Sequence, residues 1–153
     1  MPSNKNKPIV FLFGPTASGK TELAINMADK FPIELISVDS VMVYKDCNIG
    51  SAKPTKEVLK KYPHHMIDIE SPNEIFTVAD FCSLSNKLIK SAHNNNKLPL
   101  FVGGSMMYFK SLFEGIHDLP KRDDSYRKEL KELKLNSNNN NFLYEMLKDI
   151  DND

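Results

Sequence analysis

The sequence predicts an α/β fold in which a parallel sheet is flanked by helices. Short apolar runs alternate with longer segments whose apolar residues recur at helical spacing, as in parallel strands joined by crossover helices. A glycine-rich motif stands between the first apolar run and the first helical segment. A chain of 153 residues is long enough to form one such domain around a buried core.

The glycine-rich motif fits the pattern G-x-x-x-x-G-K-[ST] of a phosphate-binding loop, or P-loop. Its glycines allow a tight turn, so that several backbone N–H groups face one anion. Lys20 offers a positive charge to the terminal phosphates, and the Thr21 hydroxyl is an oxygen ligand of the kind that Mg²⁺ prefers. We therefore predict a diphosphate or nucleotide site with Mg²⁺ as cofactor and Thr21 as its ligand. The predicted phosphate-binding residues are Gly14, Pro15, Thr16, Ala17, Ser18, Gly19, Lys20 and Thr21.

The elements around this motif place a carboxylate beside it. Residues 8–13 are a continuous apolar run, typical of a strand buried on both faces. Apolar residues from Leu23 to Phe31 predict a helix that Pro32 ends. Residues 33–38 predict a second strand, and Asp39 follows it. Ligands bind outside the carboxyl ends of parallel strands, so Asp39 is a candidate general base or Mg²⁺ ligand through water. An Asp–Ser pair is equally typical of a turn cap.

The middle of the chain carries two histidines that could suggest a metal. Residues 41–53 are predicted to be irregular, and Thr55 is predicted to cap a short helix. His64 and His65 precede a short apolar segment. Neighbouring residues of a strand point to opposite faces, and no third ligand is placed by the sequence. The pattern therefore disfavours a zinc site.

A second strand–helix alternation completes the predicted core. Thr77 begins a capping box ahead of a long amphipathic helix. Residues 98–102 predict a third strand, and residues 107–113 predict a helix after it. Three strands are fewer than most sheets have, so we expect the chain to be truncated, the first part of a longer protein.

Beyond Pro120 the composition changes. Residues 125–135 and 142–150 predict two helices, separated by an asparagine-rich stretch that is typical of a flexible loop. No strand is predicted in this part. We therefore divide the chain into an incomplete α/β core, residues 1–119, and a helical segment, residues 120–153.

The bulk properties restrict the class of protein. The 20 basic residues balance the 20 acidic ones, so no net charge attracts nucleic acid. The two cysteines lack metal-binding spacing, and Cys82 falls on an apolar helix face, which predicts a buried thiol. No apolar run is long enough for a signal peptide or a membrane span. We predict a cytoplasmic protein with no membrane partner.

Five blocks in this order resemble the tRNA dimethylallyltransferases, also called tRNA isopentenyltransferases. The P-loop is shared with many families, whereas Gly-Ser-Ala-Lys-Pro-Thr and His-His-Met-Ile-Asp-Ile in this order are far more specific. The resemblance covers roughly residues 8–150 and implies a P-loop NTPase-like fold. It implies Mg²⁺-dependent transfer of a dimethylallyl group from dimethylallyl diphosphate to N6 of an adenosine next to the tRNA anticodon. The blocks are residues 14–21, Asp39-Ser40, residues 50–55, residues 64–69 and residues 102–105.

The resemblance also implies roles for individual residues. Asp39 matches the catalytic carboxylate, Lys20 belongs to the loop that holds the leaving pyrophosphate, and Ser105 matches a threonine near the reacting groups. Residues 120–153 match the start of a helical insertion that binds tRNA. The full-length protein is implied to be a monomer, whereas this chain is expected to self-associate through an open sheet edge. The implied tRNA-contacting residues are Asp39, Ser40, Val41, Met42, Ser105 and Arg127.

Some positions depart from the family pattern. Met42 replaces a glutamine that can hydrogen-bond an adenine edge, and a thioether is only a weak acceptor. Met106 replaces a glycine. The family continues past the end of this chain, so we expect the chain alone to be a poor prenyltransferase. Two alternatives stay open: a small-molecule kinase that uses the same loop with Asp39 as base, and a non-catalytic remnant that binds phosphate only.

Overall fold

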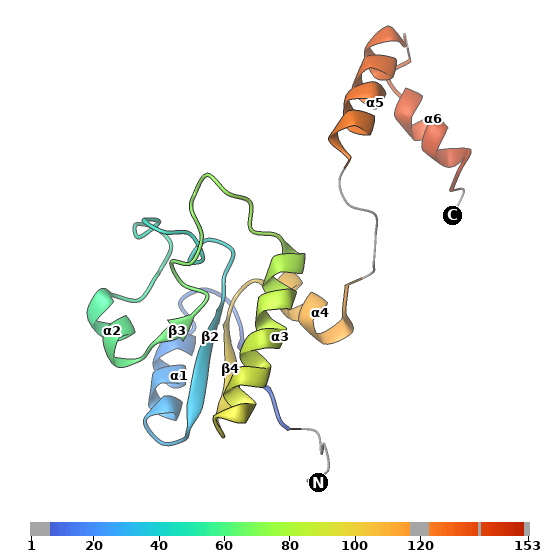
Figure 1. Cartoon of the computed structure of the whole chain (residues 1–153). Helices are drawn as coiled ribbons and strands as arrows, with labels where there is room; N and C mark the ends of the chain where they lie inside the picture. The colour runs from blue at the N-terminus through green and yellow to red at the C-terminus, as the bar shows by residue number, and fades with distance from the viewer. Residues whose placement is uncertain (1–6, 117–122, 138, 152–153) are drawn as a thin grey trace. The chain divides into compact units, whose positions relative to one another are not determined.

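The computed structural model of the protein describes residues 7–116, 123–137 and 139–151. The chain divides into two compact units, residues 1–116 and 117–153. The boundary predicted between residues 119 and 120 lies in residues 117–122, outside the described part. The first unit contains β1 (Val10–Phe13), α1 (Lys20–Ala28), β2 (Ile33–Val38), α2 (Lys56–Lys61), β3 (His64–His65), α3 (Val78–Asn94), β4 (Leu98–Gly103) and α4 (Met106–Glu114), as Figure 1 shows.

The strands form one parallel sheet in the order β1-β4-β2-β3. This confirms the predicted α/β architecture. Two details differ from the prediction. First, β3 adds a strand of two residues, which is too short to show any periodicity in a sequence. Second, β1 is only partly buried: its side chains pack against the clusters on both faces, but it lies at the edge of the sheet, and Phe13 at its end is 56% exposed.

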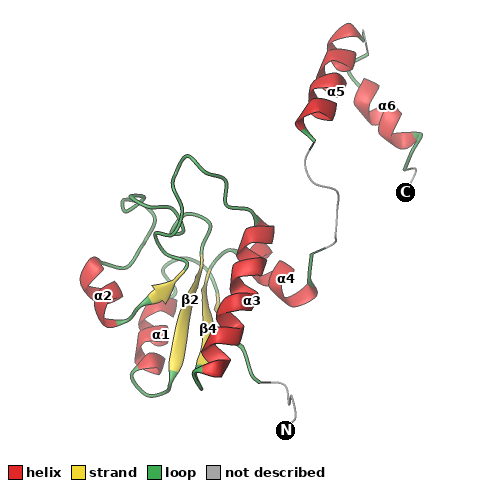
Figure 2. Cartoon of the chain, in the orientation of Figure 1, coloured by secondary structure: helices red, strands yellow, loops and turns green. Residues whose placement is uncertain are grey.

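Helices cover both faces of the sheet (Figure 2). Because side chains alternate along a strand, Leu35 and Leu100 face α1 and pack against Ala24. On the opposite face, Phe101 packs in the core formed with α3 and α4. There the rings of Phe81 and Tyr108 stack with their centroids 4.4 Å apart.

The helix starts follow the predicted caps. The Thr77 hydroxyl accepts a hydrogen bond from the Asp80 N–H (3.1 Å), and the Asp80 carboxylate accepts one from the Thr77 N–H (2.9 Å), which confirms the capping box. Thr55 caps α2 in a similar way. The predicted end of the first helix is wrong. Helix α1 stops at Ala28, because the chain turns there to enter β2, and Phe31 lies outside the helix.

The second unit consists of α5 (Asp124–Asn136) and α6 (Phe142–Lys148), which confirms the two helices predicted there. Helix α5 begins at Asp123, whose carboxylate accepts a hydrogen bond from the Tyr126 N–H (3.0 Å). Arg127 lies in its first turns and is exposed. Across all the described residues, no helix is both long and apolar enough to cross a membrane.

Candidate functional site

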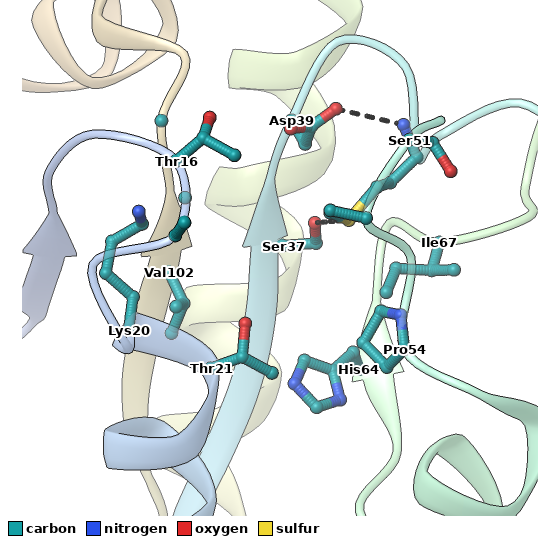
Figure 3. Close-up of a pocket in the computed structure, with 15 residues that line it drawn as sticks. Thr16, Lys20, Thr21, Ser37, Asp39, Ser51, Pro54, His64, Ile67 and Val102 are labelled. Atoms are coloured by element: carbon teal, nitrogen blue, oxygen red, sulfur yellow. Dashed lines mark hydrogen bonds between the residues drawn. The ribbon is translucent and has the colours of Figure 1, made fainter. Parts of the chain in front are cut away.

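One pocket lies at the carboxyl edge of the sheet, and five segments line it (Figure 3). One side is formed by the P-loop with the start of α1, and the opposite wall by the loop after residue 50 together with β3. The ends of β2 and β4 lie between these two walls. This is the edge where ligands bind in open parallel sheets.

The P-loop is shaped to receive an anion. Gly19 is the N-cap of α1 and has a φ of +79°, a left-handed conformation that suits glycine. The first N–H groups of a helix have no intrahelical partner, and Gly19 has no side chain that could cap them. These N–H groups are therefore suited to bind an anion. The Lys20 ammonium donates hydrogen bonds to the Pro15 carbonyl (2.5 Å) and to the Ser18 hydroxyl (3.3 Å). The loop therefore brings a cation and the N-terminus of a helix to one point.

Asp39 caps a turn, one of the two roles that the sequence leaves open, and it also lies in the pocket. Its Oδ1 accepts hydrogen bonds from the N–H groups of Val41 (2.8 Å) and Met42 (3.0 Å), so it caps the turn after β2. Asp39 also lines the pocket together with Lys20 and Thr21. Because the two turn hydrogen bonds use Oδ1, its second oxygen, Oδ2, is left for a ligand.

The ends of β2 and β4 are held close together by a glycine. A Cβ added at Gly103 would lie 2.0 Å from the Val38 carbonyl oxygen, so only glycine fits there. Just beyond it, the Ser105 hydroxyl accepts a hydrogen bond from the Ser40 N–H (3.2 Å). Ser105 thus joins the two loops at this edge, although it is not among the residues that line the pocket.

The opposite wall is held by a nearly buried lysine. The Lys53 side chain is 3% exposed, and its ammonium donates hydrogen bonds to the Tyr44 carbonyl (2.9 Å) and to the Asp68 carboxylate (2.6 Å). This ion pair joins the Gly-Ser-Ala-Lys-Pro-Thr block to the His-His-Met-Ile-Asp-Ile block. Both blocks include left-handed residues, with φ values of +54° at Ala52 and +64° at Met66. The two blocks therefore act as one structural unit that forms a wall of the pocket.

The histidines on β3 face opposite sides of the sheet. His64 lines the pocket, and its Nδ1 lies 2.7 Å from the Tyr62 carbonyl oxygen, so Nδ1 carries the proton. Burial lowers the pKa of His64, so the ring is neutral near pH 7. His65 contacts the Glu34 carboxylate (2.5 Å), which also contacts Lys97 (2.7 Å). Among the described residues, no three His, Cys, Asp or Glu side chains are grouped so that they could hold a metal ion.

The structure brings together only some of the predicted site residues. Thr16, Ala17, Lys20, Thr21, Asp39 and Met42 line the pocket. Gly14, Pro15, Ser18 and Gly19 form the loop behind it, Ser40 and Val41 lie in the exposed turn after β2, and Arg127 belongs to the second unit.

Sequence reasoning did not name the other residues that line the pocket, neither those at the ends of β2 and β4 nor those of the opposite wall. Ser37 and Val102 could have been found, because they lie two residues from Leu35 and Leu100 and so share a face of the sheet with them. The other lining residues belong to the blocks 50–55, 64–69 and 102–105 of the family resemblance, which was the signal that could have found them: Ser51, Ala52, Pro54, His64, Ile67, Gly103 and Gly104.

Comparison with known proteins adds an independent line of information. A family model described as IPP transferase matches residues 42–153. A tRNA dimethylallyltransferase of Chromobacterium violaceum is 50% identical over 121 residues, which are 79% of this chain and 37% of that protein. Another, from Vesicomyosocius okutanii, is 46% identical over 151 residues, which are 99% of this chain and 49% of that protein.

Solved structures agree with these relatives. The full-length tRNA isopentenylpyrophosphate transferase of Bacillus halodurans superposes with a TM-score of 0.71 at 37% identity, over 95% of this chain and 48% of that one. A eukaryotic dimethylallyltransferase acting on tRNA gives a TM-score of 0.77 at 29% identity, over 94% of this chain and 36% of that one. The chain thus spans at most about half the length of the relatives it matches.

Proposed function

This chain belongs to the IPP transferase family, and from that premise we propose that it provides the diphosphate-binding and proton-accepting part of a tRNA dimethylallyltransferase. The donor is dimethylallyl diphosphate, and the acceptor is N6 of an adenosine next to the anticodon. The observation that carries the proposal is that the P-loop and Asp39 line one pocket at the carboxyl edge of the sheet.

The P-loop receives the diphosphate. Its backbone N–H groups and the N-terminus of α1 bind the phosphate oxygens. Lys20 turns from the Pro15 carbonyl to the diphosphate, exchanging a neutral acceptor for a charged one. These donors are in place before the reaction, so they stabilise the negative charge that grows on pyrophosphate as it leaves.

The oxygen donors of the pocket fit Mg²⁺. This ion is held in proteins by one or two side-chain oxygens together with phosphate and water, and does not need a cage of several carboxylates. Thr21, directly, and Asp39, through water, would hold it. When bound, the ion neutralises charge on the leaving pyrophosphate.

Transfer exchanges one bond for another at the allylic carbon. The bond from this carbon to the diphosphate oxygen breaks, and pyrophosphate leaves with the electron pair. The lone pair of the adenine N6 forms the new carbon–nitrogen bond, and Asp39 Oδ2 accepts the proton that N6 releases. The exocyclic amine is a weak nucleophile, because its lone pair is delocalised into the ring. A positioned base therefore contributes to the rate. The adenine must leave its stack to reach the pocket.

A fusion protein tests this proposal. In it, residues 1–151 replace the matching part of the Vesicomyosocius okutanii relative, which supplies the other half. The fusion is incubated with dimethylallyl diphosphate, Mg²⁺ and an unmodified anticodon stem–loop RNA, and digested RNA is analysed by mass spectrometry.

Formation of dimethylallyl adenosine supports the proposal. No transfer by a fusion that still binds pyrophosphate would contradict it and would favour the phosphate-binding remnant. The kinase alternative predicts phosphorylation of a small alcohol by ATP, which the same preparation can be tested for. The names of the relatives favour prenyl transfer over this alternative.

A further inference from the structure

His64 carries a buried acceptor that no described residue of the protein uses. Its Nδ1 proton is committed to the Tyr62 carbonyl, which leaves Nε2 as an acceptor with a free lone pair. Nε2 is inaccessible to solvent and has no hydrogen-bond partner within the described residues. A buried polar atom without a partner destabilises the folded protein, so its presence calls for an explanation.

The fold places this atom on the face of the sheet that α1 covers. His64 pairs in register with Leu35, which packs beneath α1. The first turn of α1 carries Thr21. Figure 3 shows the methyl end of the Thr21 side chain toward the imidazole and the hydroxyl oxygen turned away from it, so a change of the Thr21 χ1 rotamer is needed to bring the hydroxyl to Nε2. Both residues line the same pocket.

Among the donors that line the pocket, Thr21 is the one best placed to use this acceptor. Five lining side chains carry a hydroxyl or an ammonium: Thr16, Lys20, Thr21, Ser37 and Ser51. Lys20 donates to the P-loop, Ser37 to a thioether sulfur at 3.9 Å, and Ser51 to a carbonyl oxygen at 2.6 Å. Of the two threonines, Thr16 lies at the far end of the pocket from the imidazole (Figure 3).

We propose that His64 is a positioning residue, whose Nε2 accepts the hydroxyl proton of Thr21 while the Thr21 oxygen binds Mg²⁺. This inference rests on the proposed diphosphate site. An oxygen that donates a lone pair to a cation becomes a stronger hydrogen-bond donor through its remaining proton. An acceptor that takes the remaining proton of a metal ligand fixes the direction of that ligand and strengthens its bond to the metal. Threonine in a helix populates two χ1 rotamers, so an acceptor that selects one of them matters.

The test compares metal-dependent and metal-free binding. Isothermal titration calorimetry measures binding of inorganic pyrophosphate to the 153-residue chain, with Mg²⁺ or with EDTA. We expect Mg²⁺ to tighten binding by the wild-type chain. His64→Phe, which keeps a ring but loses the acceptor, should reduce this gain about 10-fold or more and leave binding in EDTA unchanged. His64→Gln, which restores an acceptor of similar reach, should keep most of the gain.

Two further variants separate positioning from general damage. Thr21→Val should abolish the gain, and adding His64→Phe to it should have no further effect, because the two residues act as one unit. His65→Gln is the matched control. The His65 side chain is next to His64 in the sequence but contacts Glu34 and not the pocket. Circular dichroism confirms that each variant is folded.

Three results would overturn the inference. His64→Phe could keep the full Mg²⁺ gain, it could weaken binding equally in EDTA, or the wild-type chain could bind pyrophosphate without any gain from Mg²⁺. The last result would still leave the diphosphate site standing. If the wild-type chain binds no pyrophosphate under either condition, the proposed function fails as well, so the two failures are distinct.

Discussion

Gly103→Ala should strongly destabilise the first unit, because the glycine stands where two strands meet at the pocket. The added Cβ would lie 2.0 Å from the Val38 carbonyl oxygen, 2.6 Å from its carbonyl carbon and 2.8 Å from its Cβ. Ordinary contact begins at 3.4 Å, so the methyl group is about 1.4 Å too close to the oxygen. Two of these three atoms belong to the backbone of β2, which cannot move aside by changing a rotamer.

The cost should lie near the upper end of the range for overpacking, about 3 kcal/mol. A typical domain has a stability of about 5–15 kcal/mol, so this is a large fraction of the total. With a urea m-value of about 2 kcal/mol/M, the midpoint should fall by about 1.5 M. Hydrogen exchange of the β2 and β4 amides reports the same loss for the first unit alone.

Gly104→Ala is the matched control for this substitution. A Cβ at that position would meet the Gly14 carbonyl oxygen at 3.6 Å, an ordinary contact. We expect its midpoint to stay close to that of the wild type. Equal stability of the Gly103→Ala and Gly104→Ala chains would refute the reasoning, and would mean that β2 and β4 separate at this edge without cost.

The remaining predictions concern the pocket and one helix cap. Lys20→Ala should weaken pyrophosphate binding in the presence of Mg²⁺ by about 1.5–3 kcal/mol, the range for a hydrogen bond to a charged group; equal affinities in calorimetry would remove the role of this residue. In the fusion protein, Asp39→Asn should slow single-turnover transfer about 10²–10⁴-fold and leave diphosphate binding unchanged; a wild-type rate would reduce Asp39 to a turn cap. In the same fusion, Met42→Gln should improve discrimination for adenosine by about 1 kcal/mol, one neutral hydrogen bond; an unchanged or lower kcat/KM toward the stem–loop would mean that the pocket has adapted to methionine. Hydrogen bonds from Thr77 hold the pKa of Asp80 below its usual 3.8, so the stability that this carboxylate contributes is present above about pH 4 and is lost as the pH falls through the lowered pKa. Asp80→Asn should therefore destabilise the chain to urea at pH 6 and have less effect at pH 2, and an equal effect at both values would argue against this linkage.

Much of the fold could be predicted from local signals in the sequence. The capping box at Thr77 acts within one helical turn, so its hydrogen bonds follow from residue spacing alone. The segments that became β2 and β4 were predicted as strands, and in the fold they are packed by α1 on one face and by α3 and α4 on the other. The edge position of β1 could not be predicted, because strand order depends on which strands pair and not on the composition of any one of them.

The P-loop side of the pocket could be predicted from the sequence, because it follows general rules of motif and fold. Lys20 and Thr21 belong to a motif whose spacing fixes its geometry, and Asp39 follows a strand whose carboxyl end meets the same edge. The opposite wall forms only when the whole chain has folded. There, Lys53 and Asp68 are 15 residues apart and pair across two loops, which brings His64 to the pocket. That pairing depends on burial and on the packing of the whole chain, because a lysine beside a carboxylate is stable inside a protein only where both find their partners. No local pattern of residues records such a contact, and so the unpaired nitrogen of His64 became visible only in the folded protein.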